Sequence, residues 1–122
     1  MLSTDRGRAM FWAESAVGSE KRIEFKFPGG QSWVGRILES TPPHRFVIEY
    51  FGGSVTTFEL VDDGKGGTDL TLADKGVRND WRGEVIAGWV SVLMTLKAAA
   101  DYSIDLRNHD PNRTWEQGYA EN

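Results

Sequence analysis

The chain has 122 residues, a length that fits one domain with a single hydrophobic core. Its formal net charge of −4 argues against non-specific nucleic-acid binding, which requires a basic surface. The absence of cysteine excludes disulfides, thiolate metal ligands and a cysteine nucleophile, and fits a cytoplasmic location. No apolar run approaches the ~20 residues of a membrane span, and the N-terminus lacks the apolar segment of a signal peptide.

The first expected element is a short helix from about residue 5 to residue 13, capped by Ser3, Thr4 or Asp5 and broken by Gly18. From residue 21 the apolar residues alternate with polar ones, which is typical of half-buried antiparallel strands. Turn signals rich in glycine and proline separate the alternating segments. The sequence therefore predicts five strands, at residues 21–27, 31–40, 44–51, 54–62 and 68–75.

A long helix is expected from about residue 80 to residue 107, with apolar residues recurring at steps of three and four. It is the only expected element large enough to cover the apolar face of the sheet. We therefore predict an α+β fold in which an antiparallel five-stranded meander grips one long C-terminal helix, preceded by a short N-terminal helix. The chain forms a single domain, 1–122, with its core at about 9–106 and a tail, 108–122, that docks through Trp115 and Tyr119.

Three segments have a distinctive order and spacing. They are GRILESTPPHRFVIEY (35–50), TTFELVDDGKGGTDLTL (56–72) and GWVSVLMTLKAAADY (88–102). The first runs from a strand into a Pro-Pro corner, the second holds a Gly-Thr pair before the last strand, and the third opens the helix with Gly-Trp. In this arrangement the chain resembles the SRPBCC or START-like superfamily, whose shape is the helix-grip fold. It is most similar to the branch of homologues of the activator of the heat-shock chaperone ATPase.

The resemblance also implies an edge strand and most of a helix ahead of residues 2–5, and neither is present in this sequence. In the family that strand pairs with the last strand, so residues 69–75 are expected to form an unpaired sheet edge, a template for another chain. Three explanations remain open. The start is misassigned or the chain truncated, a homodimer forms through the exposed edge strand 68–75, or a monomer tolerates the open edge.

The sequence indicates no catalytic site and no metal site. His44 and His109 have no partner at ligand spacing, so both are interpreted as surface residues, and no metal or cofactor is expected. The paired glycines are hairpin turns and lack the lysine of a phosphate loop. By strand parity only Tyr50 and Glu39 could serve inside as acid or base, and Glu39 lies at a strand end where exposure to solvent is the preferred interpretation. Four other carboxylates are expected on the solvent-exposed face of the sheet: Glu24, Glu49, Glu59 and Asp69.

The remaining candidate site is an aromatic and aliphatic lining between sheet and helix. It implies either an apolar cavity or a dry packed core. The leading hypothesis is a non-enzymatic START-like domain that binds a small apolar or amphipathic ligand. The alternatives are a chaperone-linked partner-binding module, with the basic residues Lys21, Arg22, Lys26 and Arg36 as its surface, and an enzyme of the cyclase or hydratase type. The expected cavity-lining residues are Phe25, Phe27, Trp33, Phe46, Ile48, Tyr50, Phe58, Trp89, Leu93 and Met94.

Overall fold

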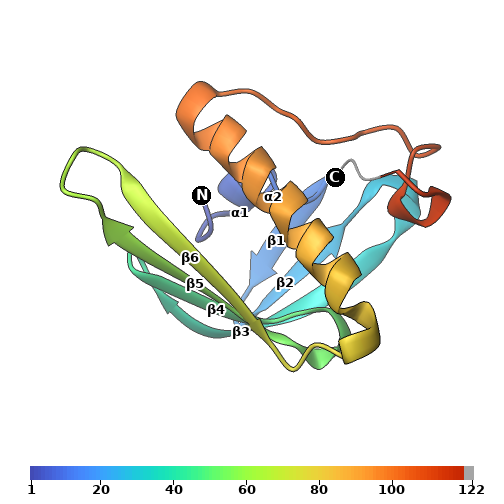
Figure 1. The fold of residues 1–122 in the computed structure, drawn as a ribbon, viewed down its shortest axis with the longest axis horizontal. Coiled ribbons are helices and arrows are strands. Elements are labelled where there is room, and N and C mark those ends of the chain that lie inside the picture. Colours follow the sequence, from blue (N-terminus) through green and yellow to red (C-terminus); the bar gives the residue numbers. More distant parts are fainter. Residues whose placement is uncertain (120–122) are drawn as a thin grey trace.

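The computed structural model describes residues 1–119 and contains one antiparallel sheet crossed by one long helix (Figure 1). Each strand pairs with its neighbour in the chain, so the sheet order is β1-β2-β3-β4-β5-β6. The predicted meander is confirmed, but it has six strands and not five. The strands are β1 (Ser15–Ser19), β2 (Arg22–Lys26), β3 (Ser32–Thr41), β4 (Arg45–Glu49), β5 (Val55–Asp62) and β6 (Thr68–Lys75).

The additional strand is β1, which forms a hairpin with β2. Gly18 was expected to break a helix, but it lies within β1 and pairs with Ile23. The strand has only five residues, of which Ala16 alone is buried, while Val17 is 53% exposed. So short a segment shows no apolar alternation, and β1 becomes a strand by pairing with the strongly alternating β2.

The N-terminal helix is also shorter than predicted. Helix α1 comprises Asp5–Arg8, and the Thr4 side chain caps it by accepting a hydrogen bond of 3.0 Å from the Gly7 N–H. Residues 9–12 form turns and not a continued helix. These turns place Phe11 and Trp12 in the core, where both side chains are almost fully buried.

The long helix α2 comprises Arg82–Tyr102 and follows a 3₁₀ turn, η3 (Asn79–Trp81). It ends five residues before the predicted residue 107 because Ser103 adopts a left-handed conformation with φ of 56°. The N–H groups of Ser103 and Ile104 then bond to the carbonyls of Ala99 and Ala98, at 3.2 and 3.1 Å. Such bonds satisfy the last helical carbonyls and end the helix.

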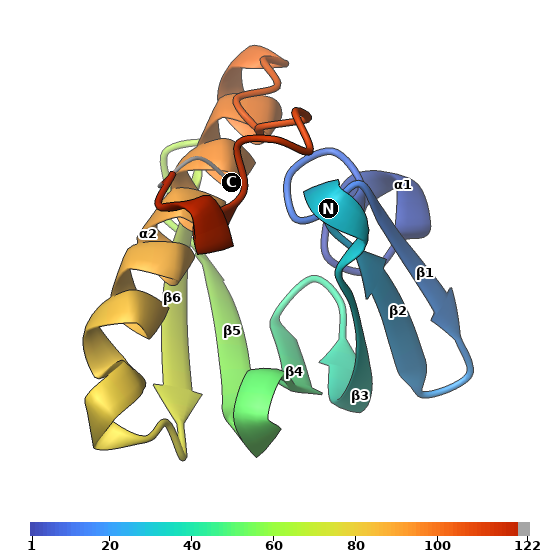
Figure 2. The same ribbon diagram turned by 90° about the vertical axis from the view of Figure 1, so that its right-hand side faces the viewer.

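Helix α2 lies across the concave face of the sheet and passes over β5 and β6 (Figures 1 and 2). Trp89, Val92 and Leu96 face the sheet and are buried. Met94, predicted to line the interior, is 58% exposed on the outer side of α2. At 3.6 residues per turn, Met94 lies about 140° around the helix from Trp89, too far to share its face. By length and composition the stretch Asn79–Tyr102 could cross a membrane, but the core helix of a water-soluble domain passes the same test.

Candidate functional site

The centre of the space between the sheet and α2 is packed with aromatic rings. Trp12 occupies this centre, and its ring centroid lies 4.8 to 5.9 Å from those of Phe25, Tyr50, Phe58 and Trp89. The packed-core alternative therefore holds at the centre. Three of the predicted lining residues, Phe25, Ile48 and Phe58, have no exposed surface and belong to this core.

Tyr50 carries the polar group at the centre of the core. Its phenolic oxygen accepts a hydrogen bond of 3.2 Å from Nε1 of Trp12. Burial raises the pKa of Tyr50 far above its ordinary value, the hydrogen bond from Trp12 acts against this, and the charge of Asp74 makes a smaller contribution that raises it further. Tyr50 is therefore a neutral hydroxyl at neutral pH and is engaged within the core by its bond from Trp12.

Two open pockets flank the packed centre. One of about 560 Å³ lies between the second half of α2, residues 1–3 and the corner at Pro42–Pro43, and Phe46 and Leu93 line it. We call it the corner pocket. The other, of about 540 Å³, lies between the first half of α2 and the ends of β2, β4 and β6, and Phe27, Tyr50 and Trp89 line it. We call it the aromatic pocket.

The predicted lining residues thus divide among the two pockets, the packed core and the surface. Trp33 belongs to neither pocket and packs against Phe51 in a tilted arrangement, at a centroid distance of 4.9 Å. Its buried Nε1 has no hydrogen-bond partner among residues 1–119.

The aromatic pocket is built from segments far apart in the sequence. The ends of β2 and β4 lead into the 3₁₀ turns η1 (Pro28–Gly30) and η2 (Phe51–Gly53), and α2 and the C-terminal tail complete the walls. Ring contacts join several of its members, such as Tyr50 with Trp89 at 5.3 Å and Phe27 with Phe51 at 5.9 Å. Three of its aromatic residues were not predicted as lining: Phe51, Trp81 and Trp115. Phe51 and Trp81 were assigned to the end of a strand and the start of the long helix but lie in 3₁₀ turns, and Trp115 lies in the tail, where no period reveals orientation.

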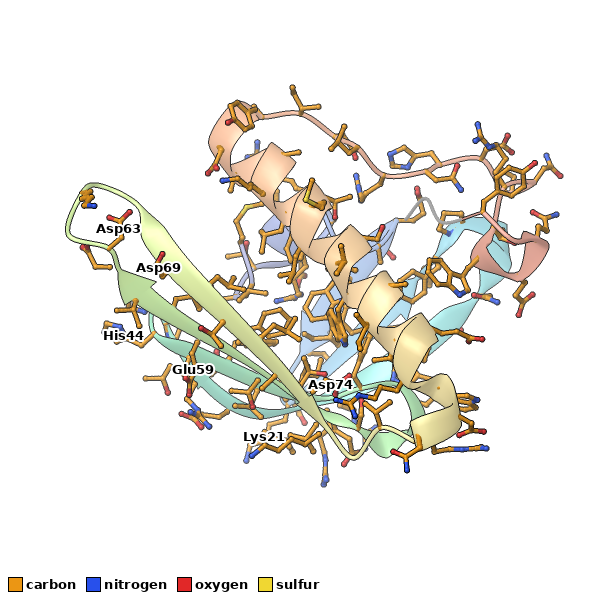
Figure 3. The ribbon with its side chains drawn as sticks, in the orientation of Figure 1. Lys21, His44, Glu59, Asp63, Asp69 and Asp74 are labelled. Atoms are coloured by element: carbon orange, nitrogen blue, oxygen red, sulfur yellow. The ribbon has the colours of Figure 1, made fainter. Side chains whose placement is uncertain are left out.

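Asp74 is a pocket residue that sequence reasoning missed. Its Oδ2 accepts a hydrogen bond of 2.8 Å from Nε1 of Trp89, and its Oδ1 accepts one of 3.1 Å from the Thr56 hydroxyl. Figure 3 shows Asp74 beneath the first half of α2, far from Asp63 and Asp69 at the other end of the β5–β6 hairpin. Asp74 shares strand parity with Leu70 and Leu72, which are both partly buried. That parity was the signal that could have identified it.

The C-terminal tail forms one wall of the aromatic pocket through residues 108 and 114–116. Figure 1 shows the tail running from the end of α2 back across the molecule toward the ends of β2 and β3. The guanidinium of Arg107 donates a hydrogen bond of 2.6 Å to the carbonyl of Ala13 and is paired with Asp105. These contacts hold the tail against the segment before β1. Beyond them Trp115 begins a 3₁₀ turn, η4 (Trp115–Gln117), and lines the pocket while 41% exposed. Tyr119, the other residue expected to dock the tail, is also 41% exposed and lies beneath the guanidinium of Arg113.

His109 strengthens this attachment. One ring nitrogen contacts Glu14 and the other lies 3.0 Å from Asp105. Desolvation is the largest single effect on the pKa of His109 and lowers it, but the bonds and charges of the two carboxylates together raise it. The pKa of Asp105 is lowered far below its usual range, chiefly by the hydrogen bond from Arg107.

Each acid or base candidate either lies outside both pockets or is already bonded to another residue of the fold. A β-bulge between Ile37 and Glu39 makes Ile37 pair with Ile48 and Glu39 with Val47, which shifts the parity of β3 by one residue. Glu39 is therefore exposed and forms an ion pair of 3.0 Å with Arg45. His44 is exposed at the proline corner. Within residues 1–119 no group of three or more His, Cys, Asp or Glu is arranged to hold a metal ion.

Comparison with known families identifies this architecture. The model of the family described as "Activator of Hsp90 ATPase homolog 1-like protein" matches residues 5–101. The chain belongs to this family. The expected resemblance is thereby confirmed, and the six-stranded sheet with one long C-terminal helix fits the helix-grip fold of START-like domains.

A solved structure shares this fold. The crystal structure of the protein SSP2350 from Staphylococcus saprophyticus superimposes with a TM-score of 0.73, over 90% of this chain and 85% of that one. The two sequences are 16% identical, so the likeness shows the fold alone. No curated protein matches the chain significantly.

Proposed function

We propose that the chain is a non-enzymatic binding domain that holds a small apolar or amphipathic molecule in the aromatic pocket. One observation carries the proposal: six aromatic side chains from five segments of the chain surround one open pocket of about 540 Å³. A volume of roughly 300–1,000 Å³ and a mainly apolar lining with few polar groups are typical of small-molecule sites. The START-like fold, with a ligand space between sheet and C-terminal helix, is consistent with this use.

The chemistry of the site favours binding over catalysis. Tyr50 is kept neutral and is bonded to Trp12, and the carboxylate of Asp74 is held by Trp89 and Thr56. Both groups are engaged with the fold, and the hydroxyl bonded to Asp74, that of Thr56, has no exposed surface from which to reach a bound molecule. Rings and a fixed carboxylate can orient a bound molecule, but they do not form an acid–base pair.

The chaperone-linked alternative receives less support from the described surface. Of the four basic residues expected to form a partner surface, Lys26 and Arg36 are already paired with Glu24 and Glu49, at 3.8 and 3.1 Å. Isolated exposed ion pairs of this kind are common on sheet surfaces and do not indicate a partner. Stimulation of a purified chaperone ATPase by the chain would nevertheless favour this alternative over the ligand-binding proposal.

Gly88 offers a direct test of the aromatic pocket. It lines the pocket, and a Cβ at this position would meet nothing within 4 Å, so Gly88→Leu should fill part of the opening without disturbing the backbone. Gly83 lies on the same helix, is equally unobstructed and does not line the pocket, so Gly83→Leu is the matched control. Both variants should gain helix propensity of up to about 1 kcal/mol, so a difference between them reports on the pocket.

The measurement is thermal unfolding with fatty acids, sterols, aromatic polyketide-like compounds and alkyl amines. A ligand at 100 times its Kd should stabilise the wild type and G83L by about 2.7 kcal/mol, and G88L by much less. A panel in which no compound stabilises the wild type would refute the proposal. So would a compound that stabilises G88L as strongly as G83L.

A further inference from the structure

The ionisable side chains that line the aromatic pocket are predominantly acidic. Three carboxylates line it, those of Asp74, Glu84 and Glu116, and its lining includes no lysine, arginine or histidine. None of the three carboxylates belongs to an ion pair within residues 1–119. The corner pocket differs, because Arg45 and Lys97 balance its single carboxylate, Asp101. The charge bias is therefore specific to the aromatic pocket.

Aromatic rings add to the same preference. The face of an indole, phenol or phenyl ring carries negative potential and attracts organic cations, most strongly where water is excluded. The pocket has three tryptophans, a tyrosine and two phenylalanines. Arg78, a cation just outside the lining, already lies 4.6 Å above Trp81 and is paired with Asp80, so it does not neutralise the pocket.

We propose that the aromatic pocket selects a small organic cation, an amine or quaternary ammonium group attached to an apolar body. In this arrangement the apolar body lies among the rings and the positive group lies near Asp74, Glu84 and Glu116. A phospholipid headgroup is a poorer fit, because the lining has no basic group to bind its phosphate. This inference rests on the proposed binding function and adds the charge of the ligand to it.

Three probes with the same alkyl chain separate charge from apolar contact: hexyltrimethylammonium, hexanol and hexanoate. Tryptophan fluorescence is a suitable readout because Trp81, Trp89 and Trp115 all line the pocket. The cation should bind about fivefold or more tightly than the alcohol, and the carboxylate most weakly. Added NaCl should weaken binding of the cation and leave that of the alcohol unchanged.

A pair of double variants tests whether the named carboxylates are responsible. Glu84 and Glu116 are both exposed, so Glu84→Gln with Glu116→Gln should leave the fold intact and weaken cation binding roughly threefold to tenfold. Glu20→Gln with Glu59→Gln changes the net charge equally at exposed positions outside the pocket and should have no effect. Hexanol should bind both double variants equally.

The outcomes are distinguishable. Equal binding of cation and alcohol would overturn the charge preference and leave the binding function standing, whereas no binding of any probe would overturn both. Loss of cation binding in the control double variant as large as in the pocket variant would also overturn the proposal, because it would show only an effect of net charge.

A second and independent observation concerns strand β6, which forms one edge of the sheet among the described residues. Asp69 and Lys75 lie near its two ends, are exposed, and form no ion pair within residues 1–119. In an antiparallel pair, directly opposite residues both point their backbone N–H and C=O groups toward the partner strand or both point them away. For two copies of β6 related by a two-fold axis, the axis must therefore pass through a residue and not between two residues. With the axis at Leu72, Asp69 of each copy lies opposite Lys75 of the other.

We infer that a second copy of this chain pairs with β6 in this register. Light scattering at micromolar concentration should give twice the monomer mass of 13.6 kDa. Lys75→Asp should place like charges together and shift the protein toward monomer, and Lys75→Asp combined with Asp69→Lys should restore the dimer. A monomeric wild type, or a dimer that K75D leaves unchanged, would overturn this inference.

Discussion

Nε1 of Trp12 donates a hydrogen bond of 3.2 Å to the phenolic oxygen of Tyr50, at the centre of the space between the sheet and α2. The two residues are 38 positions apart in the chain, and their ring centroids are 5.6 Å apart. This contact closes the middle of the space between the sheet and α2, and the corner pocket and the aromatic pocket lie on either side of it. The location of any ligand therefore depends on a side chain from the irregular segment after α1.

Replacement of Trp12 should open the core. Trp12→Ala removes a side chain that is 1% exposed and is expected to lower the free energy of unfolding by about 3–5 kcal/mol. Urea unfolding at neutral pH measures this loss. Met10→Ala is a suitable control, because Met10 is 38% exposed in the same segment and should change stability far less. A loss for W12A no larger than for M10A would contradict the packed centre.

Tyr50 should make the protein sensitive to alkali. Because burial raises its pKa in the folded state, only the unfolded state loses this proton readily, so stability should fall as pH rises above about 10. Tyr50→Phe removes this titration, and its urea midpoint should decline less between about pH 9 and pH 11. Tyr102, which is 68% exposed, provides the control variant Tyr102→Phe. Parallel declines for Y50F and the wild type would refute the assignment.

Attachment of the tail should depend on His109 and therefore on pH. A raised folded-state pKa means that the stabilising contribution of His109 is complete below its unfolded pKa of about 6.5 and is lost as pH rises through the folded value. Asp105, with a lowered pKa, contributes above about pH 3.8 and loses its contribution as pH falls through its folded value. The tail should thus be held most firmly between these limits, at mildly acid pH.

Proton NMR titration of His109 tests this directly. The pKa of His109 should exceed the ordinary histidine value of about 6.5 in the wild type and fall when Glu14→Gln removes one carboxylate partner. Glu20→Gln removes an equal charge elsewhere and should leave it unchanged. A titration of His109 that does not respond to E14Q would show that the contact between tail and core is absent in solution.

Arg8 should be essential for the N-terminal segment. It is 3% exposed, and its guanidinium donates to the carbonyls of Ala16 and Leu2, at 3.1 and 2.8 Å, and to the carboxylate of Asp5. Burial is the main effect on the pKa of Arg8 and lowers it, and the charge of Asp5 opposes this. Arg8→Met would leave these acceptors unpaired, at an expected cost of about 3 kcal/mol.

Arg6 is exposed on the same short helix, so Arg6→Met is the matched control and should be nearly neutral. Chemical denaturation of both variants gives the comparison. If R8M and R6M unfold at the same denaturant concentration, the buried guanidinium does not anchor β1.

Much of the architecture followed from local pattern. Side chains of a strand alternate between two faces whatever the rest of the chain does, so Ile23 and Phe25, like Phe46 and Ile48, could be assigned to the buried face in advance. The length and apolar stripe of α2 likewise required a sheet beneath it. The family assignment rested on the order of such segments and was confirmed over residues 5–101.

Several of the predictions that were wrong or incomplete depended on long-range contacts, which local periodicity does not indicate. The bulge at residue 38 shifted the parity of β3, and Glu39 is exposed, in agreement with its preferred interpretation. Met94, which was predicted to line the interior, lies on the outer side of α2. Strand β1 exists because β2 offers it a partner, and the aromatic pocket exists because turns and the tail bring Phe51, Trp81 and Trp115 together.

Periodicity therefore predicted the sheet, the long helix and most of the buried faces, since each depends on backbone geometry within a few residues. The position of the pocket depended on long-range packing. Trp12 fills the middle of the space between the sheet and α2 only when the whole sheet has curved around α2. Asp74 reaches Trp89 only when β6 lies under that helix. These contacts join residues that are 77 and 15 positions apart, and three-dimensional packing alone brings them together.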